Sequence, residues 1–294
     1  MTVKAAVGQI CSTACIKHNL DQCVQLVAKA ALGGAQILFL PEASDYIAAD
    51  AQASLQLAAP QSSSPFLQGL RAAAQEHAIA VHVGIHATTA TTAKLLNRVL
   101  YIQPDGQIDQ AATYDKLHVF DYGSLRESAT VQPGARLTPP FDSPVGRIGS
   151  LICFDVRFPE PGLALAQPAR SSPWAARPAQ VLTYPSAFTV PTGRAHWETL
   201  LRARAIETQS WVVAAAQAGR HNAVRVSYGH SMVVDPWGEV KLRLGGVADE
   251  DALAEQVAGQ LGFVEVDVQL VERTRQQMPL QRRLDVYHLE CTNL

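Results

Sequence analysis

The sequence predicts an α/β fold in which helices pack on buried strands. Three observations indicate this fold: short apolar runs recur along the chain, most of them alternate with segments of helical periodicity, and no linker rich in Gly, Ser or Pro divides the 294 residues. Apolar runs of this kind are typical of parallel strands buried on both faces, so we expect mostly parallel strands covered by helices. A hydrophobic content of 48% is enough for a large core.

The individual elements are assigned from periodicity and from Gly and Pro punctuation. The first helix is expected to open at Asn19, which forms the pattern of a capping box with Gln22, and to end near Leu32. On the helix 193–208, Trp197 and Leu201 lie on one apolar stripe that is expected to pack on the core. The expected order is a strand at 3–10, a helix at 19–32, strands at 36–40, a helix at 64–77, strands at 79–85 and 98–102 with a hairpin turn at 104–106, a strand at 146–153, a helix from Pro159, a strand at 180–184, a helix at 193–208, a strand at 211–216, a strand–turn–strand unit at 229–240 and a strand at 263–267.

Cys153 ends the apolar run 146–153 and lies shortly before Pro159, which opens a helix. Near a helix N-terminus the dipole favours the thiolate and lowers a thiol pKa that is ordinarily about 8.5, which predicts an activated nucleophile. Taken alone, the residue fits better with an inert core cysteine, because Cys is among the most often buried residue types.

Two further segments change this interpretation. Glu42 follows the apolar run 36–41, and Lys116 lies where the strand-like segment 112–116 gives way to a loop. A carboxylate at the end of a buried strand is costly unless it has a partner or a function. A base, a cation and a thiol at strand ends are what acyl transfer from an amide requires.

These three segments resemble the carbon–nitrogen hydrolase (nitrilase) superfamily, whose hallmark is a Glu-Lys-Cys triad. The resemblance runs from the strand at 3–10 to the segment 281–287. It implies a four-layer α-β-β-α sandwich and a single carbon–nitrogen hydrolase domain over residues 1–294, with no cofactor or metal. It also implies Glu42 as general base, Lys116 as the cation that stabilises the oxyanion together with the backbone N–H of Phe154, and Cys153 as nucleophile.

The resemblance extends to residues around the triad. Glu127 occupies the position of a second glutamate typical of the family, and it is expected to orient the lysine or the substrate; the alternative is a solvated loop residue. Phe188 and Thr192 are expected to line the substrate pocket by resemblance only.

Arg157 lies four residues after the nucleophile. Its guanidinium can bind a carboxylate with two parallel hydrogen bonds, which suits a 2-oxo acid substrate. The alternative is a structural ion pair with Asp155 or Glu160.

The segment 153–160 resembles the Nit-type amidases within the superfamily. The segments 183–188, 214–221 and 227–238 are closer to the branch that acts on deaminated glutathione than to the ω-amidases, which act on α-ketoglutaramate. The expected products are 2-oxoglutarate and cysteinylglycine, formed through a cysteine thioester in a metabolite-repair reaction. The alternatives are an ω-amidase, a non-catalytic scaffold or regulatory protein, and a thiol redox protein. The last lacks a neighbouring cysteine near Cys153.

Charge and cysteine usage bear on partners and compartment. The net charge of −2, the pI near 6.5 and the absence of a Lys/Arg run argue against nucleic-acid or membrane-surface partners. No apolar stretch approaches the length of a membrane span, and no signal-peptide pattern opens the chain. Five cysteines in a chain of this length fit a reducing compartment, so we expect a cytoplasmic protein, with the mitochondrion as the alternative.

Metal binding is not favoured by spacing. Cys11 and Cys15 lack a second ligand pair, and His82 and His86 lack a third ligand. The resemblance implies a homodimer or higher homo-oligomer, with the region of the helix 193–208 near the subunit interface. The chain departs from its relatives at 168–178, which is proline-rich and expected to be irregular, and at 245–262, where a longer loop and a short helix are expected.

Overall fold

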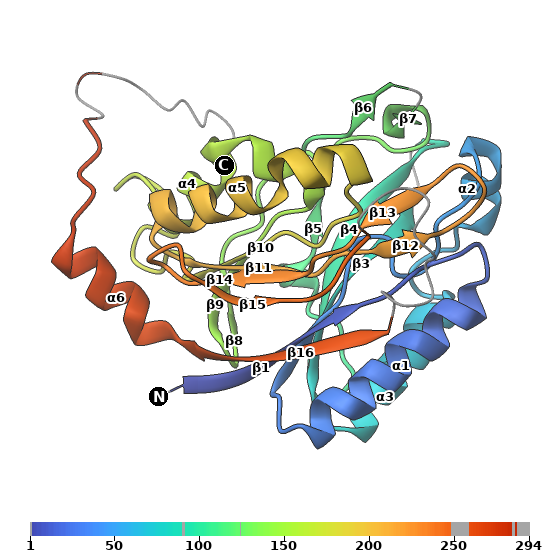
Figure 1. The fold of residues 1–294 in the computed structure, drawn as a ribbon, viewed down its shortest axis with the longest axis horizontal. Helices are drawn as coiled ribbons and strands as arrows, with labels where there is room; N and C mark the ends of the chain where they lie inside the picture. Colours follow the sequence, from blue (N-terminus) through green and yellow to red (C-terminus); the bar gives the residue numbers. More distant parts are fainter. Residues whose placement is uncertain (1, 90–91, 124, 248–258, 284–285, 287–294) are drawn as a thin grey trace.

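The computed structural model describes residues 2–89, 92–123, 125–247, 259–283 and 286. Two six-stranded sheets lie face to face (Figure 1). The strands of the first sheet, in spatial order, are β16 (Gln260–Asp267), β1 (Thr2–Gln9), β2 (Ile37–Phe39), β3 (Ala80–Thr88), β4 (Leu95–Ile102) and β5 (Tyr114–Asp115). Those of the second are β15 (Val240–Arg243), β14 (Met232–Val234), β11 (Trp211–Ala214), β10 (Val181–Thr183), β9 (Gly146–Ser150) and β8 (Phe141–Ser143).

Helices cover the outer face of each sheet. α1 (Ile16–Leu32) and α3 (Pro65–Glu76) pack on the first sheet, and α4 (Pro159–Ala166) and α5 (Val190–Thr208) pack on the second. Three buried apolar clusters match the three interfaces: helices with first sheet, sheet with sheet, and second sheet with helices. The four-layer α-β-β-α sandwich is therefore confirmed.

The smaller elements are α2 (Ala51–Leu57), α6 (Val268–Gln277), β6 (Asp121–Tyr122), β7 (Leu125–Arg126), β12 (Ala218–Arg220), β13 (Val226–Tyr228) and the 3₁₀ turns η1 (Gln110–Ala112), η2 (Glu127–Ala129) and η3 (Cys153–Arg157).

The expectation of mostly parallel strands was wrong. Only the central strands of each sheet are parallel, β1–β2–β3 in the first and β9–β10–β11 in the second. The flanking pairs, among them β3 with β4 and β14 with β15, are antiparallel. The connections between β3 and β4 and between β14 and β15 are too short for the crossover that a parallel pair requires, so these strands return as hairpins.

The capping box expected at Asn19 was also wrong. α1 begins at Ile16, and Asn19 is buried one turn inside the helix. Its Oδ1 accepts a hydrogen bond from the Thr13 N–H at 2.8 Å, and its Nδ2 donates to the Asp45 carbonyl at 2.8 Å. The side chain therefore faces the core and holds the loop after β2 instead of capping the helix.

Other elements lie close to their expected positions. Trp197 and Leu201 are buried along α5, as the apolar stripe predicted. The turn at 104–106 is present, but an isolated bridge and a 3₁₀ turn separate it from the short strand β5. The segment 168–178 forms a series of turns and packs Trp174 into the core, while most of 245–262 lies outside the described residues.

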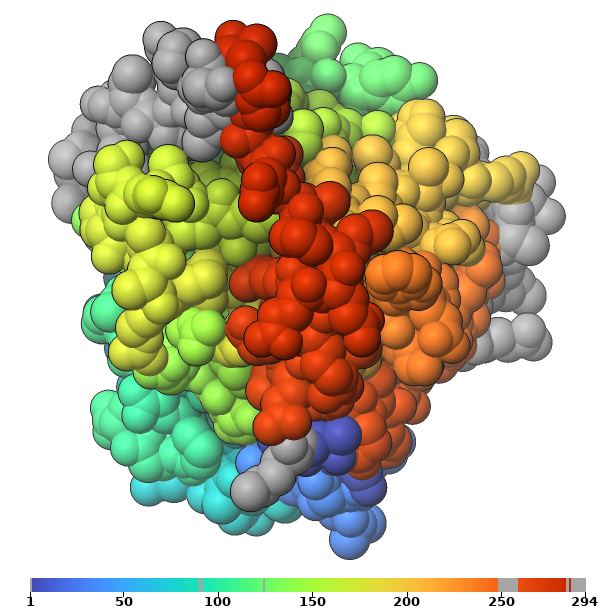
Figure 2. All heavy atoms as spheres, turned by 90° about the vertical axis from the view of Figure 1, so that its left-hand side faces the viewer, coloured from blue at the N-terminus to red at the C-terminus, as the bar shows by residue number. Residues whose placement is uncertain are grey.

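The C-terminal part of the chain connects regions far apart in sequence. In Figure 2, α6 and the chain after it (red) run between the segment near 160–180 (yellow-green) and the later part of the second half (yellow to orange). Arg275 donates to the Ala179 carbonyl at 3.1 Å and to Ser210 Oγ at 3.0 Å. Arg282 continues this seam by donating to Gln167 Oε1 at 2.9 Å.

Candidate active site

The three side chains expected to form the triad come from the ends of strands in both sheets. Glu42 follows β2, Lys116 follows β5, and Cys153 follows β9 and opens η3. All three are buried and line one pocket. The fold therefore brings together groups that are widely separated in the sequence.

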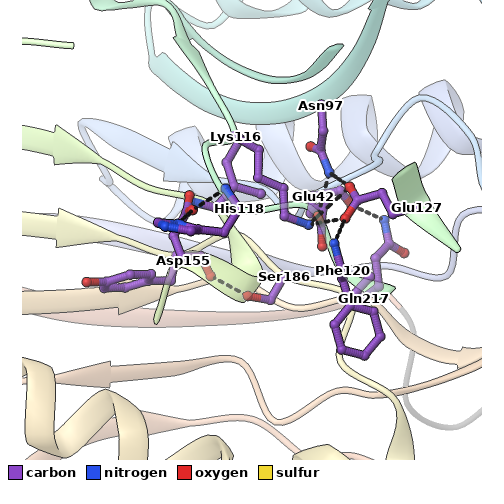
Figure 3. A network of polar contacts seen from close by, with 12 residues as sticks. Glu42, Asn97, Lys116, His118, Phe120, Glu127, Asp155, Ser186 and Gln217 are labelled. Atoms are coloured by element: carbon purple, nitrogen blue, oxygen red, sulfur yellow. Dashed lines mark hydrogen bonds and ion pairs between the residues drawn. The ribbon is translucent and has the colours of Figure 1, made fainter. Parts of the chain in front are cut away.

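A closed ring of polar contacts surrounds the lysine (Figure 3). Lys116 Nζ lies 2.9 Å from Glu42 Oε1 and 2.9 Å from Glu127 Oε2. Opposite the ammonium, Asn97 Nδ2 donates to Glu42 Oε1 at 2.6 Å and to Glu127 Oε1 at 2.9 Å. Both carboxylates are thus bridged twice, by an ammonium and by an amide. Glu127 is not a solvated loop residue; only 17% of its side chain is exposed, and it contacts the lysine directly.

The electrostatics of the ring favour the charged forms of Glu42 and Lys116. Burial raises the pKa of Glu42, but the charge of Lys116 and hydrogen bonds from Lys116, Cys153 and Asn97 outweigh it, so the pKa lies below its ordinary value. Burial lowers the pKa of Lys116, but the carboxylates of Glu127 and Glu42 raise it well above the ordinary value. At neutral pH the site therefore holds a carboxylate base beside a fixed cation.

The Cys153 thiol lies close enough to Glu42 for the two groups to shift each other's pKa. Burial and the charge of Glu42 raise the pKa of this thiol, against the opposing effects of Lys116 and the Ala187 backbone N–H. The expected lowering by a helix dipole was wrong, because the helix that opens at Pro159 is α4, whereas Cys153 sits in the separate 3₁₀ turn η3. Glu42, and not a helix end, is placed to activate the sulfur.

The backbone is strained at Cys153 and directly after Glu42. Cys153 has φ 45° and Ala43, directly after Glu42, has φ 53°, in the left-handed region that non-glycine residues rarely adopt. The Cys153 N–H donates to the Pro185 carbonyl at 3.0 Å, and Gln217 Nε2 donates to the Glu42 carbonyl at 2.9 Å. Pro185 and Gln217 belong to the second half of the chain, and their hydrogen bonds hold the two turns in place.

Asp155 joins the lysine loop to the nucleophile turn. This fully buried carboxylate accepts hydrogen bonds from Tyr114 Oη at 2.8 Å and from the Ile152 N–H at 2.9 Å. It also accepts from the His118 N–H at 3.0 Å (Figure 3). Since Lys116 lies between Tyr114 and His118, this network fixes the lysine relative to Cys153.

The pocket has a volume of about 580 Å³, within the range typical of small-molecule sites. The residues expected to bind substrate, Arg157, Phe188 and Thr192, all line it. Arg157 lies over the rings of Phe154 and Phe188, 5.6 and 5.4 Å from their centroids. Among the described residues it forms no ion pair with Asp155 or Glu160, so its charge stays available to the pocket.

Comparison with known proteins assigns the family. The model of the carbon–nitrogen hydrolase family matches residues 4–276. The chain belongs to the carbon–nitrogen hydrolase family. As a member of that family, it is expected to cleave carbon–nitrogen bonds of amides.

Similar carbon–nitrogen hydrolases cover nearly the whole chain. It is 41% identical to "Probable hydrolase nit2" of Schizosaccharomyces pombe over 289 residues, which are 96% of this chain and 98% of that protein. It is also 41% identical to the deaminated glutathione amidase of Homo sapiens over 293 residues, covering 96% of this chain and 83% of that protein. The crystal structure of the C. elegans NitFhit protein superposes with a TM-score of 0.85 at 38% identity. That match covers 97% of this chain and 66% of the longer NitFhit chain.

Sequence reasoning missed several polar residues of this hydrolase site. Asn97 was not considered, although a polar residue directly before the apolar run 98–102 was a signal that could have found it. His86 lines the pocket, with Nδ1 3.0 Å from Asp45 Oδ1 and its ring stacked on Tyr46 at 4.2 Å. Burial lowers the pKa of His86, but Asp45 and the nearby glutamates raise it above its ordinary value.

The contacts of His82 show the role of this second histidine. His82 is buried and lies 3.1 Å from Ser150 Oγ, so it is a satisfied core residue. Within residues 2–89, 92–123, 125–247, 259–283 and 286, no cluster of three or more His, Cys, Asp or Glu side chains is arranged to hold a metal ion. In the same part of the chain, no helix is both long and apolar enough to cross a bilayer.

Proposed function

We propose that the protein is a thiol amidase that hydrolyses deaminated glutathione to 2-oxoglutarate and cysteinylglycine. The observation that carries the proposal is the convergence of Cys153, Glu42 and Lys116 in one pocket that Arg157 also lines, with Lys116 Nζ 2.9 Å from Glu42 Oε1. The 41% identity to proteins named deaminated glutathione amidase supports the choice of substrate.

Acylation begins when the Cys153 sulfur attacks the amide carbonyl and its proton passes to Glu42. The carbonyl oxygen becomes an oxyanion, which Lys116 Nζ and the Phe154 N–H stabilise. The Phe154 N–H suits this role because the first N–H groups of a helical turn have no acceptor within it. Glu42 then gives the proton to the amine nitrogen and the carbon–nitrogen bond breaks. Cysteinylglycine departs, and a 2-oxoglutaryl thioester remains on Cys153.

Hydrolysis of the thioester uses the same base in the second half of the cycle. Glu42 removes a proton from water, the resulting hydroxide attacks the thioester carbonyl, and Lys116 again stabilises the oxyanion. The carbon–sulfur bond then breaks, the sulfur regains a proton from Glu42, and 2-oxoglutarate leaves. The whole cycle consumes one water and changes no oxidation state, so it needs no oxidant or reductant.

Substrate comparison tests the proposal most directly. Purified protein is incubated with deaminated glutathione and with α-ketoglutaramate, and 2-oxoglutarate is measured from each. A large preference in kcat/KM for deaminated glutathione is expected. A preference for α-ketoglutaramate would make the protein an ω-amidase, and no activity on either would favour another amide or a scaffold role.

Variants of the nucleophile test the mechanism. Cys153→Ser and Cys153→Ala are expected to abolish turnover while circular dichroism and thermal unfolding stay unchanged, because the side chains fit the same space. A Cys153→Ala protein that retained activity would contradict the covalent mechanism. A defined Cys153 disulfide in mass spectra of the oxidised wild type would instead support a redox role.

We also propose a homodimer or larger homo-oligomer in the reducing interior of the cell, built around α5. Ile206 on α5 and Trp237 on the adjacent β14–β15 turn are 44% and 63% exposed, and Arg202 Nε bonds the Gly238 carbonyl of that turn at 2.9 Å. Large exposed apolar side chains that lie together are typical of interfaces. Ile206→Glu is expected to shift the protein to monomer in sedimentation velocity, and an unchanged distribution would rule out this face.

A further inference from the structure

The pocket carries more positive charge than the chemistry at Cys153 uses. Its acidic residues are engaged: Glu42 and Glu127 contact Lys116, and Asp50 caps α2 by accepting from the Ala53 N–H at 2.8 Å. Three arginines also line the pocket, and within the described part of the chain none of them lies within ion-pair distance of a carboxylate. They are Arg126, Arg157 and Arg225.

Arg225 stands out among the three because its donors are poorly satisfied. It lies at the start of the β13 hairpin strand and is partly buried. Nη2 donates to the Ala187 carbonyl at 2.7 Å, whereas Nε is buried without an acceptor among the described residues. A buried charged donor without a partner is unfavourable. Arg225 also lines the pocket, so its guanidinium can bind an acidic group of a ligand there.

Ala187 connects Arg225 with the nucleophile. Its carbonyl accepts from Arg225 at 2.7 Å, and its backbone N–H lowers the pKa of the Cys153 thiol. Arg157 forms no ion pair with a carboxylate among the described residues; it lies over the rings of Phe154 and Phe188, and its Nη1 is 3.2 Å from His196 Nδ1. Two cations therefore line the pocket that holds the nucleophile, and they come from different elements, η3 and the β12–β13 hairpin.

This arrangement suits a substrate with two carboxylates. The proposed substrate carries one on the 2-oxo acid portion and a second at the end of a dipeptide leaving group, about 7 Å from the scissile nitrogen in an extended conformation. We propose, on the basis of the proposed function, that Arg225 binds the terminal carboxylate of a peptide-like leaving group while Arg157 binds the 2-oxo acid. A monoanionic amide such as α-ketoglutaramate leaves Arg225 without a ligand, so Arg225 selects for the longer substrate.

A matched pair of substrates tests the assignment. Deaminated glutathione is compared with its C-terminal amide, which has the same shape but lacks the second carboxylate, and kcat/KM is measured for both with wild type and Arg225→Gln. The ratio of the two values is expected to fall by roughly 10- to 100-fold in the variant, mainly through KM, because a charge-assisted hydrogen bond is lost. This ratio does not depend on how much of the variant is correctly folded.

The controls separate the possible failures. Arg225→Lys keeps the charge and is expected to restore part of the ratio, and Arg220→Gln, on the same hairpin but outside the pocket lining, is expected to keep the wild-type ratio. Equal losses on both substrates in Arg225→Gln would overturn the assignment and leave the proposed function intact. A wild type inactive on deaminated glutathione would overturn the proposed function and this assignment with it.

Discussion

Asn97 shows how one amide can set the state of a catalytic base. Its single Nδ2 group donates to both Glu42 and Glu127, so both carboxylates are held in position beside Lys116. A hydrogen bond to the charged form of an acid lowers its pKa. Asn97 is therefore a positioning residue that acts through Glu42.

Replacing Asn97 by Ala is expected to lower kcat/KM by roughly 10- to 100-fold, because a buried charge-assisted hydrogen bond is lost. Loss of the donor raises the pKa of Glu42, and Glu42 must be ionised to accept the thiol proton. The acidic limb of the pH profile of kcat/KM is therefore expected to move to higher pH. Asn97→Ser, which keeps one donor, should shift it less; an unshifted limb in Asn97→Ala would mean that the role is only structural.

Arg157 allows a prediction about recognition. Lys cannot reproduce the two parallel hydrogen bonds of a guanidinium, so Arg157→Lys is expected to raise KM for 2-oxo acid amides about 10-fold with a smaller change in kcat. Initial-rate kinetics at fixed pH give both constants. An unchanged KM would remove Arg157 from the recognition of substrate.

At the scale of elements, His82 connects the two sheets across their interface. It lies on β3, and Nε2 is 3.1 Å from Ser150 Oγ on β9 and 3.2 Å from Thr183 Oγ1 on β10. Burial lowers the pKa of His82 to about 3. The native state thus holds a neutral imidazole that the unfolded chain protonates below its ordinary pKa of about 6.5.

This linkage predicts a pH-dependent stability. The unfolded state binds the proton between pH 6.5 and 3 and the native state does not, so the contribution of His82 is complete above pH 6.5 and falls by up to about 1.4 kcal/mol per pH unit below it. His82→Gln is expected to flatten the fall in the free energy of unfolding over this range, measured by urea titration at several pH values. His18→Gln, which removes an exposed imidazole of α1, is the matched control, and equal slopes in both variants would contradict the prediction.

At the scale of the molecule, the C-terminal helix braces both sheets. β16 forms the edge of the first sheet, and α6 follows it directly. From α6, Arg275 donates to the Ala179 carbonyl and Ser210 Oγ, which lie just before the central strands β10 and β11 of the second sheet. The closing segment therefore ties together sheets that share no strand.

Arg275→Met is expected to lower the free energy of unfolding by about 1–3 kcal/mol, since it leaves buried acceptors without a charged donor while keeping the aliphatic packing. Chemical denaturation measures this. Arg273→Met, on the exposed side of the same helix, is the control and is expected to cost less than about 1 kcal/mol, because its ion pair with Asp267 is at the surface. Equal costs in the two variants would show that the brace does not stabilise the fold.

The sequence by itself predicted buried strands covered by helices and the three side chains that meet in the candidate site, while the four-layer arrangement was implied by the family resemblance. Apolar strands and striped helices appear in the local pattern, and Glu42, Lys116 and Cys153 each stand at the end of such a strand, where local motifs are informative. The pattern does not encode strand direction beyond the hairpins, which is why a mostly parallel arrangement was expected and two parallel cores with antiparallel flanks were found.

Only the tertiary structure decided how the groups work. The thiol was expected to be activated by a helix end, but its pKa depends on burial and on Glu42, a residue more than one hundred positions away in the chain. Asn97 and Arg225 gained their roles in the same way, from contacts between distant segments. Electrostatic interactions act through space and depend on burial, and neither quantity can be read from the order of residues along a chain.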